Sequence, residues 1–131
     1  MDVSRTRRLL LPAVVYALIL ALSSVPGSSI DQLGLPSIFS YLGHAIEYGL
    51  LGGALTWALT DASATRDTDA NERDATRILI VVAVVVAMLG GVDELYQGTV
   101  PGRQTSMLDL GVDVIAASIA SVVVSRRMAG R

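Results

Sequence analysis

The chain has 131 residues, of which 52% are hydrophobic and 17% charged, and its formal net charge is -2. A soluble domain averages about 45–50% apolar and about 25% charged residues, so both values favour a chain that lies in a membrane. The absence of cysteine excludes a disulfide-linked scaffold, and the single histidine excludes a site built on several histidines. Ten basic residues against twelve acidic ones argue against nucleic-acid binding.

Four apolar stretches predict membrane-spanning helices, at residues 9–25, 37–60, 78–99 and 107–124. Each is long enough to cross about 30 Å of hydrocarbon as a helix. They are about twice the length of a barrel strand and lack its alternating pattern. We therefore expect one domain over residues 1–131, an all-α integral membrane four-helix bundle.

The first stretch has two interpretations. Arginines before an apolar run, followed by Ala21-Leu22-Ser23, are also typical of a cleaved secretory signal peptide. The length of the run favours a retained span, with Pro12 in its first turn, where a missing N–H does little harm. This span has no charged side chain, so we expect it to serve in packing or to face lipid.

Arginine placement predicts the orientation of the bundle. Nine of the ten arginines lie in the N-terminal tail, the connection 61–77 or the C-terminal tail. These three regions share one side of a four-span protein, and the positive-inside rule makes that side the cytoplasm. Both termini are then cytoplasmic in a multi-pass protein of the cell membrane. The polar composition of residues 61–77 predicts a solvated, mobile loop.

Small residues in the second span predict close helix contacts. Gly49 and Gly53 form a small-xxx-small face, which favours packing within one bundle over dimerisation. An oligomer through this face is conceivable but is not predicted. Trp57, near the inner end of the same span, is typical of an interfacial anchor.

Polar residues on three of the spans are the main functional signal. An ionisable group inside a span costs about 2.5–3.5 kcal/mol on insertion scales and usually faces the bundle interior. Residues three or four apart share a helix face, so each of these spans presents one polar stripe. The stripes consist of His44, Glu47 and Tyr48 in the second span, Asp93, Glu94 and Gln97 in the third, and Asp109 and Asp113 in the fourth.

The depth of these residues predicts a polar pocket that opens outward. At about 1.5 Å per residue, all of them fall in the outer half of the membrane. The turn pair Pro101-Gly102 returns Arg103 to the mouth of the pocket, where it can pair with Asp109 or bind an anion. Ser106 is positioned to cap the fourth span, with Asp109 three residues later.

These motifs, in this order, resemble the pattern of VanZ-like proteins, which are small integral membrane proteins. The resemblance rests on His44-Ala-Ile-Glu47-Tyr48, Asp93-Glu94-Leu-Tyr-Gln97, Val100-Pro101-Gly102-Arg103 and Ser106-x-x-Asp109-x-x-x-Asp113. It covers the second to fourth spans and implies a cell-envelope role, because the protein that gives the family its name is associated with teicoplanin resistance. Many members have Asn in place of Asp113, and Tyr41 replaces a basic residue often found before the motif histidine.

Three functions compete for the polar cluster. The favoured one is binding or handling of an extracytoplasmic amphiphile, such as a lipid, a lipid-linked precursor or a lipoglycopeptide, with antibiotic resistance as one consequence. The second is a membrane-embedded hydrolase or transferase that acts on a lipid head group. The third is a purely structural polar network.

Each candidate residue has an expected role. Arg103 would clamp an anion, His44 and Glu47 would form a proton-active pair, and Glu94 and Asp109 would act as acid partners. Under the enzymatic alternative the catalytic candidates are His44, Glu47, Asp93 and Glu94. The ligand-binding candidates are Tyr48, Gln97, Arg103, Asp109 and Asp113. The sequence identifies no cofactor, and one histidine with several acids leaves a divalent metal open.

Overall fold

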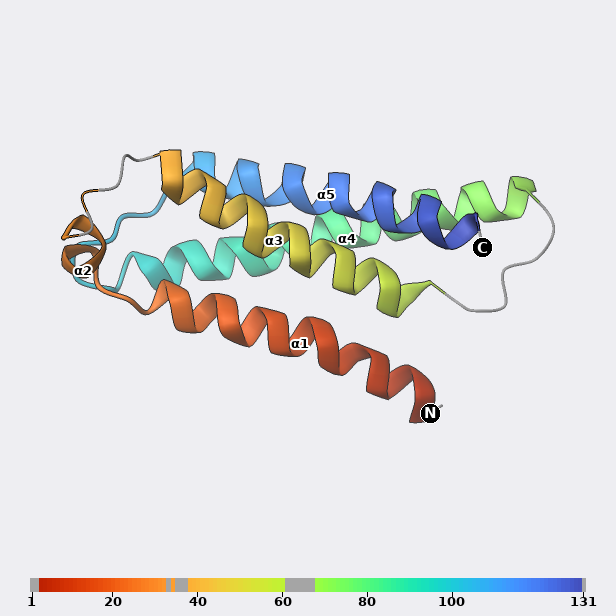
Figure 1. The fold of residues 1–131 in the computed structure, drawn as a ribbon, viewed down its shortest axis with the longest axis horizontal. Helices are drawn as coiled ribbons and strands as arrows, with labels where there is room; N and C mark the ends of the chain where they lie inside the picture. Colours follow the sequence, from red (N-terminus) through yellow and green to blue (C-terminus); the bar gives the residue numbers. More distant parts are fainter. Residues whose placement is uncertain (1–2, 33, 35–37, 61–67, 131) are drawn as a thin grey trace.

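The computed structural model describes residues 3–32, 34, 38–60 and 68–130, and every regular element in these ranges is a helix. The helices are α1 (Val3–Ser23), α2 (Gly27–Asp31), α3 (Ile38–Leu59), α4 (Thr68–Gln97) and α5 (Met107–Ala129). The four long helices run side by side, and α2 lies at one end of them, beside the connection between α4 and α5 (Figure 1). The start of α1 and the end of α5 lie towards the opposite end.

Among the residues that the structure describes, two helices, within Glu72–Gln97 and Met107–Ala129, are long and apolar enough to cross a membrane. They correspond to the predicted third and fourth spans. In α3 the polar residues and glycines lower the hydropathy. For α1 and α3, membrane crossing therefore stays a prediction.

The observed helices are longer than the predicted spans at three ends. Residues 61–67 lie outside the described residues, but Thr68 to Arg77 are helical, so the prediction of a loop over 61–77 is wrong for that part. Acidic residues near a helix start interact favourably with its dipole, and Asp74 pairs with Arg77 at 3.6 Å one turn later. Polar composition alone therefore did not distinguish the first turns of a helix from a loop.

The start of α1 and the end of α5 also extend beyond the predicted spans. Helix α5 continues past the predicted limit through Arg126 and Arg127, cations that suit a helix C-terminus. Helix α1 begins at Val3, so Pro12 lies inside the helix and not in its first turn as predicted. The connection between α1 and α3 also contains the short helix α2, which was not predicted.

Packing is closest where small residues meet. Helix α3 contacts α1, α4 and α5, and a Cβ added to Gly52 would lie 2.5 Å from the Cα of Ala117 on α5. Gly49 and Gly53 also approach α5, near Ala116 and Ala120. The small face of α3 is thus used inside the bundle, and the two backbones are nearly in contact at Gly52.

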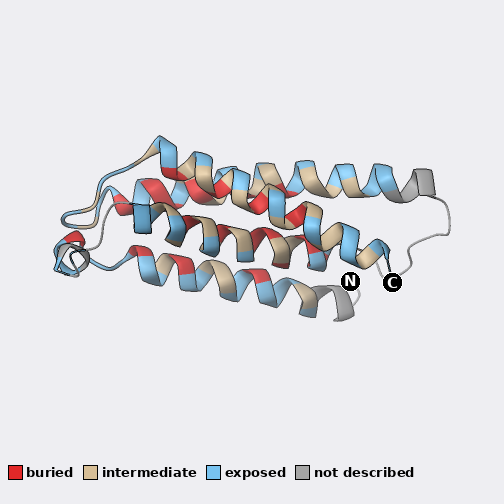
Figure 2. Cartoon of the chain, turned by 45° about the horizontal axis from the view of Figure 1, so that its top comes forward, coloured by how far each residue is buried: buried red, intermediate tan, exposed pale blue. Residues whose placement is uncertain are grey.

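The surface of the bundle is largely apolar, whereas part of its interior is polar. Large apolar side chains cover the outside, with Leu50 62%, Leu95 72% and Leu108 70% exposed. Buried residues line the inward faces of the helices (Figure 2). The apolar core contains Ile19, Tyr48, Leu51, Val82, Val86 and Ala117. Charged and polar side chains fill the interior between this core and the α2 end.

Candidate functional site

His44 is the centre of the buried polar cluster. It projects from α3, and its Nδ1 lies 3.0 Å from Oδ1 of Asp113 on α5 in a buried hydrogen bond. Its Nε2 lies 3.8 Å from Oδ2 of Asp109, one turn earlier on α5. The close approach of α3 and α5 at Gly52 and Ala117 brings the imidazole within reach of both carboxylates.

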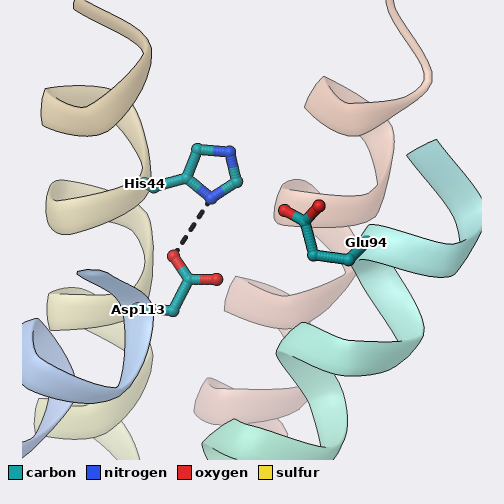
Figure 3. Close-up of side chains that lie close together, drawn as sticks. All are labelled: His44, Glu94 and Asp113. Carbon is teal, nitrogen blue, oxygen red and sulfur yellow. Dashed lines mark hydrogen bonds and ion pairs between the residues drawn. The ribbon is translucent and has the colours of Figure 1, made fainter. Parts of the chain in front are cut away.

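Glu94, on α4, completes the cluster. Its carboxylate points from α4 towards His44 and Asp113 (Figure 3). One ligand atom from each of His44, Glu94 and Asp113 can be chosen so that all three lie within 4.8 Å of one another. Three helices that are separate in sequence therefore meet at one point, as the polar stripes predicted.

The start of α5 is held by this same glutamate. Ser106 is the N-cap and its Oγ accepts a hydrogen bond from the backbone N–H of Asp109, as predicted. The backbone N–H of Ser106 itself donates to Oε2 of Glu94. In a capping box this second bond goes to the third residue of the same helix. Here Glu94 takes that place, which leaves the Asp109 side chain directed to His44.

A second polar group lies beside the first and is centred on Asp93. Its Oδ2 accepts hydrogen bonds from the Tyr48 hydroxyl at 3.2 Å and from Gln97 Nε2 at 3.0 Å. Gln97 also donates to the Ser23 hydroxyl of α1 at 3.2 Å. Tyr48 links the two groups, because its ring is parallel to that of His44 with centroids 6.2 Å apart.

Helix α1 takes part in this second group, contrary to the expectation that it only packs or faces lipid. Ser23 belongs to the group, and Tyr16 of the same helix makes a separate hydrogen bond, from its hydroxyl to the Leu89 carbonyl of α4 at 3.0 Å. Neither residue carries a charge at neutral pH, so the charged residues of the spans did not point to them. A serine at the C-terminal end of an apolar helix and a tyrosine about two turns before it were the available signal.

Glu47 and Arg103 lie at the edge of the cluster. Glu47 is half-buried and lies within electrostatic range of His44, Asp93 and Arg103. Among the described residues, His44 is hydrogen-bonded to Asp113 and not to Glu47, the partner expected from sequence. The closely packed α5 brings the Asp113 carboxylate within 3.0 Å of the imidazole.

Arg103 follows the predicted turn. The Arg103 N–H bonds to the Val100 carbonyl at 3.1 Å, and Gly102 has φ +78°, which suits glycine in a type II turn. The turn also contacts α2, since the Gly27 N–H donates to the Pro101 carbonyl. No ion pair joins Arg103 to Asp109 or to another described acid, and its buried Nε has no hydrogen-bond partner in the described part of the chain.

Unpaired atoms are concentrated here. Within the described residues, the buried side-chain atoms that lack a hydrogen-bond partner are Asp93 Oδ1, Glu94 Oε1, Arg103 Nε, Asp109 Oδ1 and Asp113 Oδ2. Asp113 is fully buried and Glu94 is 6% exposed. Buried polar groups in folded proteins are nearly always paired, so these five atoms distinguish the cluster from the rest of the described chain.

Gly90 is a supporting residue that the sequence did not single out. A Cβ at this position would lie 2.9 Å from Leu110 Cδ1 and 3.2 Å from Asp113 Oδ2. The glycine therefore leaves the space that the Asp113 carboxylate occupies. The pair Gly90-Gly91 in an apolar helix was the signal, although Gly91 has open space around it.

Comparison with known proteins identifies no relative: no family model, curated protein or solved structure matches this chain.

Proposed function

We propose that this chain is a small integral membrane protein of the VanZ-like type, whose buried polar cluster binds the head group of an extracytoplasmic amphiphile. The bundle would cross the membrane four times, with both termini in the cytoplasm. A lipid, a lipid-linked precursor or a lipoglycopeptide would be the ligand, and altered teicoplanin sensitivity would be one consequence.

The inverted distribution of polarity supports the membrane placement. Leucine, isoleucine and valine side chains face outward on all four long helices, whereas His44, Asp93 and Asp113 are enclosed. In water this arrangement would expose apolar surface and bury charge, both of which are unfavourable. In lipid it is the expected arrangement, because intramembrane ionisable groups face the bundle interior.

The position of the cluster supports an outward-facing site. His44, Glu94 and Asp113 lie within about 9 Å of the ends of α3, α4 and α5. These ends meet α2 and the Arg103 turn, at the end of the bundle away from the arginine-rich segments. With arginines on the cytoplasmic side, the cluster faces the outer leaflet.

The single observation that carries ligand binding is the set of orphaned buried atoms. A purely structural network would satisfy its own members, but five buried atoms around this cluster lack partners in the described part of the chain. Four are acceptors and one, Arg103 Nε, is a donor. Such a mixed set suits a head group with both hydroxyl or ammonium donors and a phosphate or carboxylate acceptor.

An enzyme remains the second candidate, for one specific reason. Hydrogen bonding of His44 to a fully buried carboxylate at 3.0 Å is the arrangement of a general base and its orienting partner. Hydrolysis or transfer at a bound lipid head group would use this pair. Release of a cleaved head group in the presence of the purified protein would distinguish the enzyme from a binding protein.

Native mass spectrometry of protein purified in mild detergent tests the proposal. We expect a lipid-sized adduct on the wild-type chain that Arg103→Ala and Glu94→Gln reduce at least tenfold. Glutamine keeps an oxygen that can accept from the Ser106 N–H, so Glu94→Gln should remain folded. Glu72→Gln, an exposed change at the other end of α4, is the matched control and should keep the adduct.

Two outcomes would contradict the proposal. A wild-type protein without adduct would remove the evidence for a bound amphiphile. Equal loss of membrane-inserted protein in Arg103→Ala and Glu94→Gln would make these residues structural. Yield and elution volume in detergent, measured beside the adduct, separate the two cases.

A further inference from the structure

We infer that His44, Glu94 and Asp113 form a binding site for one divalent transition-metal ion of the zinc or manganese type. The inference concerns the same cluster as the proposed function but does not require an amphiphile. A metal would bind at the point where α3, α4 and α5 meet.

The donor set fits such an ion. One imidazole and two carboxylates offer the nitrogen and oxygen ligands that zinc and manganese accept, and no cysteine is present to favour a softer metal. The three ligand atoms already lie within 4.8 Å of one another. Tetrahedral ligands at about 2.1 Å from zinc are roughly 3.4 Å apart. Side-chain rotations that bring the ligand atoms about 1.4 Å closer together would therefore place all three at bonding distance from one ion.

Unpaired oxygens provide an independent indication. Glu94 Oε1 and Asp113 Oδ2 are buried and have no hydrogen-bond partner among the described residues. Both side chains are more than nine-tenths buried, and both carboxylates face the space beside the imidazole (Figure 3). A cation there would supply the partner that each oxygen lacks.

The charge balance also calls for a cation. Asp93 and Asp109 lie within electrostatic range of Asp113, and Asp109 and Asp113 lie within electrostatic range of Glu94. Across the described residues, these acids form ion pairs only with His44, which is neutral unless it is protonated. A divalent ion would cancel two negative charges in a region where unbalanced charge is costly.

Asp109 would support the site from its edge. Its Oδ2 lies 3.8 Å from His44 Nε2, and its own Oδ1 is unpaired. It would orient the imidazole, or become a fourth ligand after a rotation of the side chain. Carboxylates that hold a ligating histidine are common around metal ions and raise metal affinity.

The test uses the full chain in mild detergent, with Zn²⁺ as the probe. After equilibration with Zn²⁺ and removal of the excess, elemental analysis should find one zinc per chain. Glu94→Gln and Asp113→Asn keep the shape of the side chains and should weaken binding at least tenfold. Glu72→Gln, an exposed residue of α4, should bind like the wild type.

Co²⁺ provides a second readout that reports on the ligands themselves. The wild type should give a visible absorption spectrum of Co²⁺ with a nitrogen ligand, and His44→Gln should change or abolish it. Zinc binding that is unaffected in both Glu94→Gln and Asp113→Asn, or a cobalt spectrum unaffected by His44→Gln, would overturn the inference. A folded wild-type protein that retains no zinc would also overturn the inference.

Measuring lipid adducts on the same samples separates the two proposals. Lipid without metal would overturn the metal site and leave amphiphile binding standing. Metal without lipid would overturn amphiphile binding and leave the metal site standing.

Discussion

At the residue scale, Asp113 and its surroundings are the most constrained part of the site. The side chain is fully buried, bonds to His44 with one oxygen and leaves the other unpaired. The space for its carboxylate exists because the facing residue on α4 is Gly90. A small residue on one helix therefore decides the position of a charged group on another.

Gly90→Ala should displace the Asp113 carboxylate and destabilise the protein by about 1–3 kcal/mol, the usual range for overpacking. Thermal unfolding in detergent measures this, with Gly91→Ala as the matched control. A methyl at Gly91 meets nothing within 4 Å and should be neutral, or slightly stabilising because alanine favours helix. Equal stability of the two variants would show that the contact at Gly90 is unimportant.

The sequence predicted which residues face the interior, but not which of them pair. Spacing placed His44, Glu94 and Asp113 on inward stripes, and the structure brings them together. Spacing did not reveal that His44 bonds Asp113 in preference to Glu47, because that choice depends on the distance between α3 and α5. Ser23 and Tyr16 were missed because uncharged groups in an apolar helix give a weak signal.

At the element scale, the start of α5 connects the fold to the site. Ser106 caps the helix with its hydroxyl, and its N–H is bound by Glu94 from α4. The pattern Ser-x-x-Asp predicted the first bond. The second bond is a contact between helices, which no local pattern contains.

Ser106→Ala should lose the cap and lower the free energy of unfolding by about 1 kcal/mol. Ser118→Ala is the control on the same helix, because that hydroxyl donates only to the Val114 carbonyl one turn earlier and should be nearly neutral when removed. The comparison is made by thermal unfolding in detergent. If the two variants lost the same stability, the cap would have no special role.

Helix ends were the least predictable feature of the elements. Hydropathy located the apolar centres of all four long helices. It placed the start of α4 at residue 78, whereas the helix begins at Thr68. Hydropathy measures suitability for lipid, while a helix can continue into water as long as its backbone hydrogen bonds and local charge pairs persist.

At the scale of the whole molecule, two features support one account. Apolar side chains cover the outside, and a cluster of acids around one histidine lies inside near one end. The arginine-rich segments are at the other end of the helices, and Trp57 there contacts Arg8, whose guanidinium lies 5.5 Å from the ring centroid. The apolar outside predicts that the protein lies in a membrane, and the arginines at one end predict which end faces the cytoplasm.

The most direct test is the labelling of single cysteines by a membrane-impermeant thiol reagent, since the natural chain has none. Gln104→Cys, in the exposed turn beside the site, should react in intact cells. Asp74→Cys, exposed near the start of α4, should react only after the membrane is permeabilised. The reverse pattern, or labelling of both positions in intact cells, would contradict a polar site that faces outward from within the membrane.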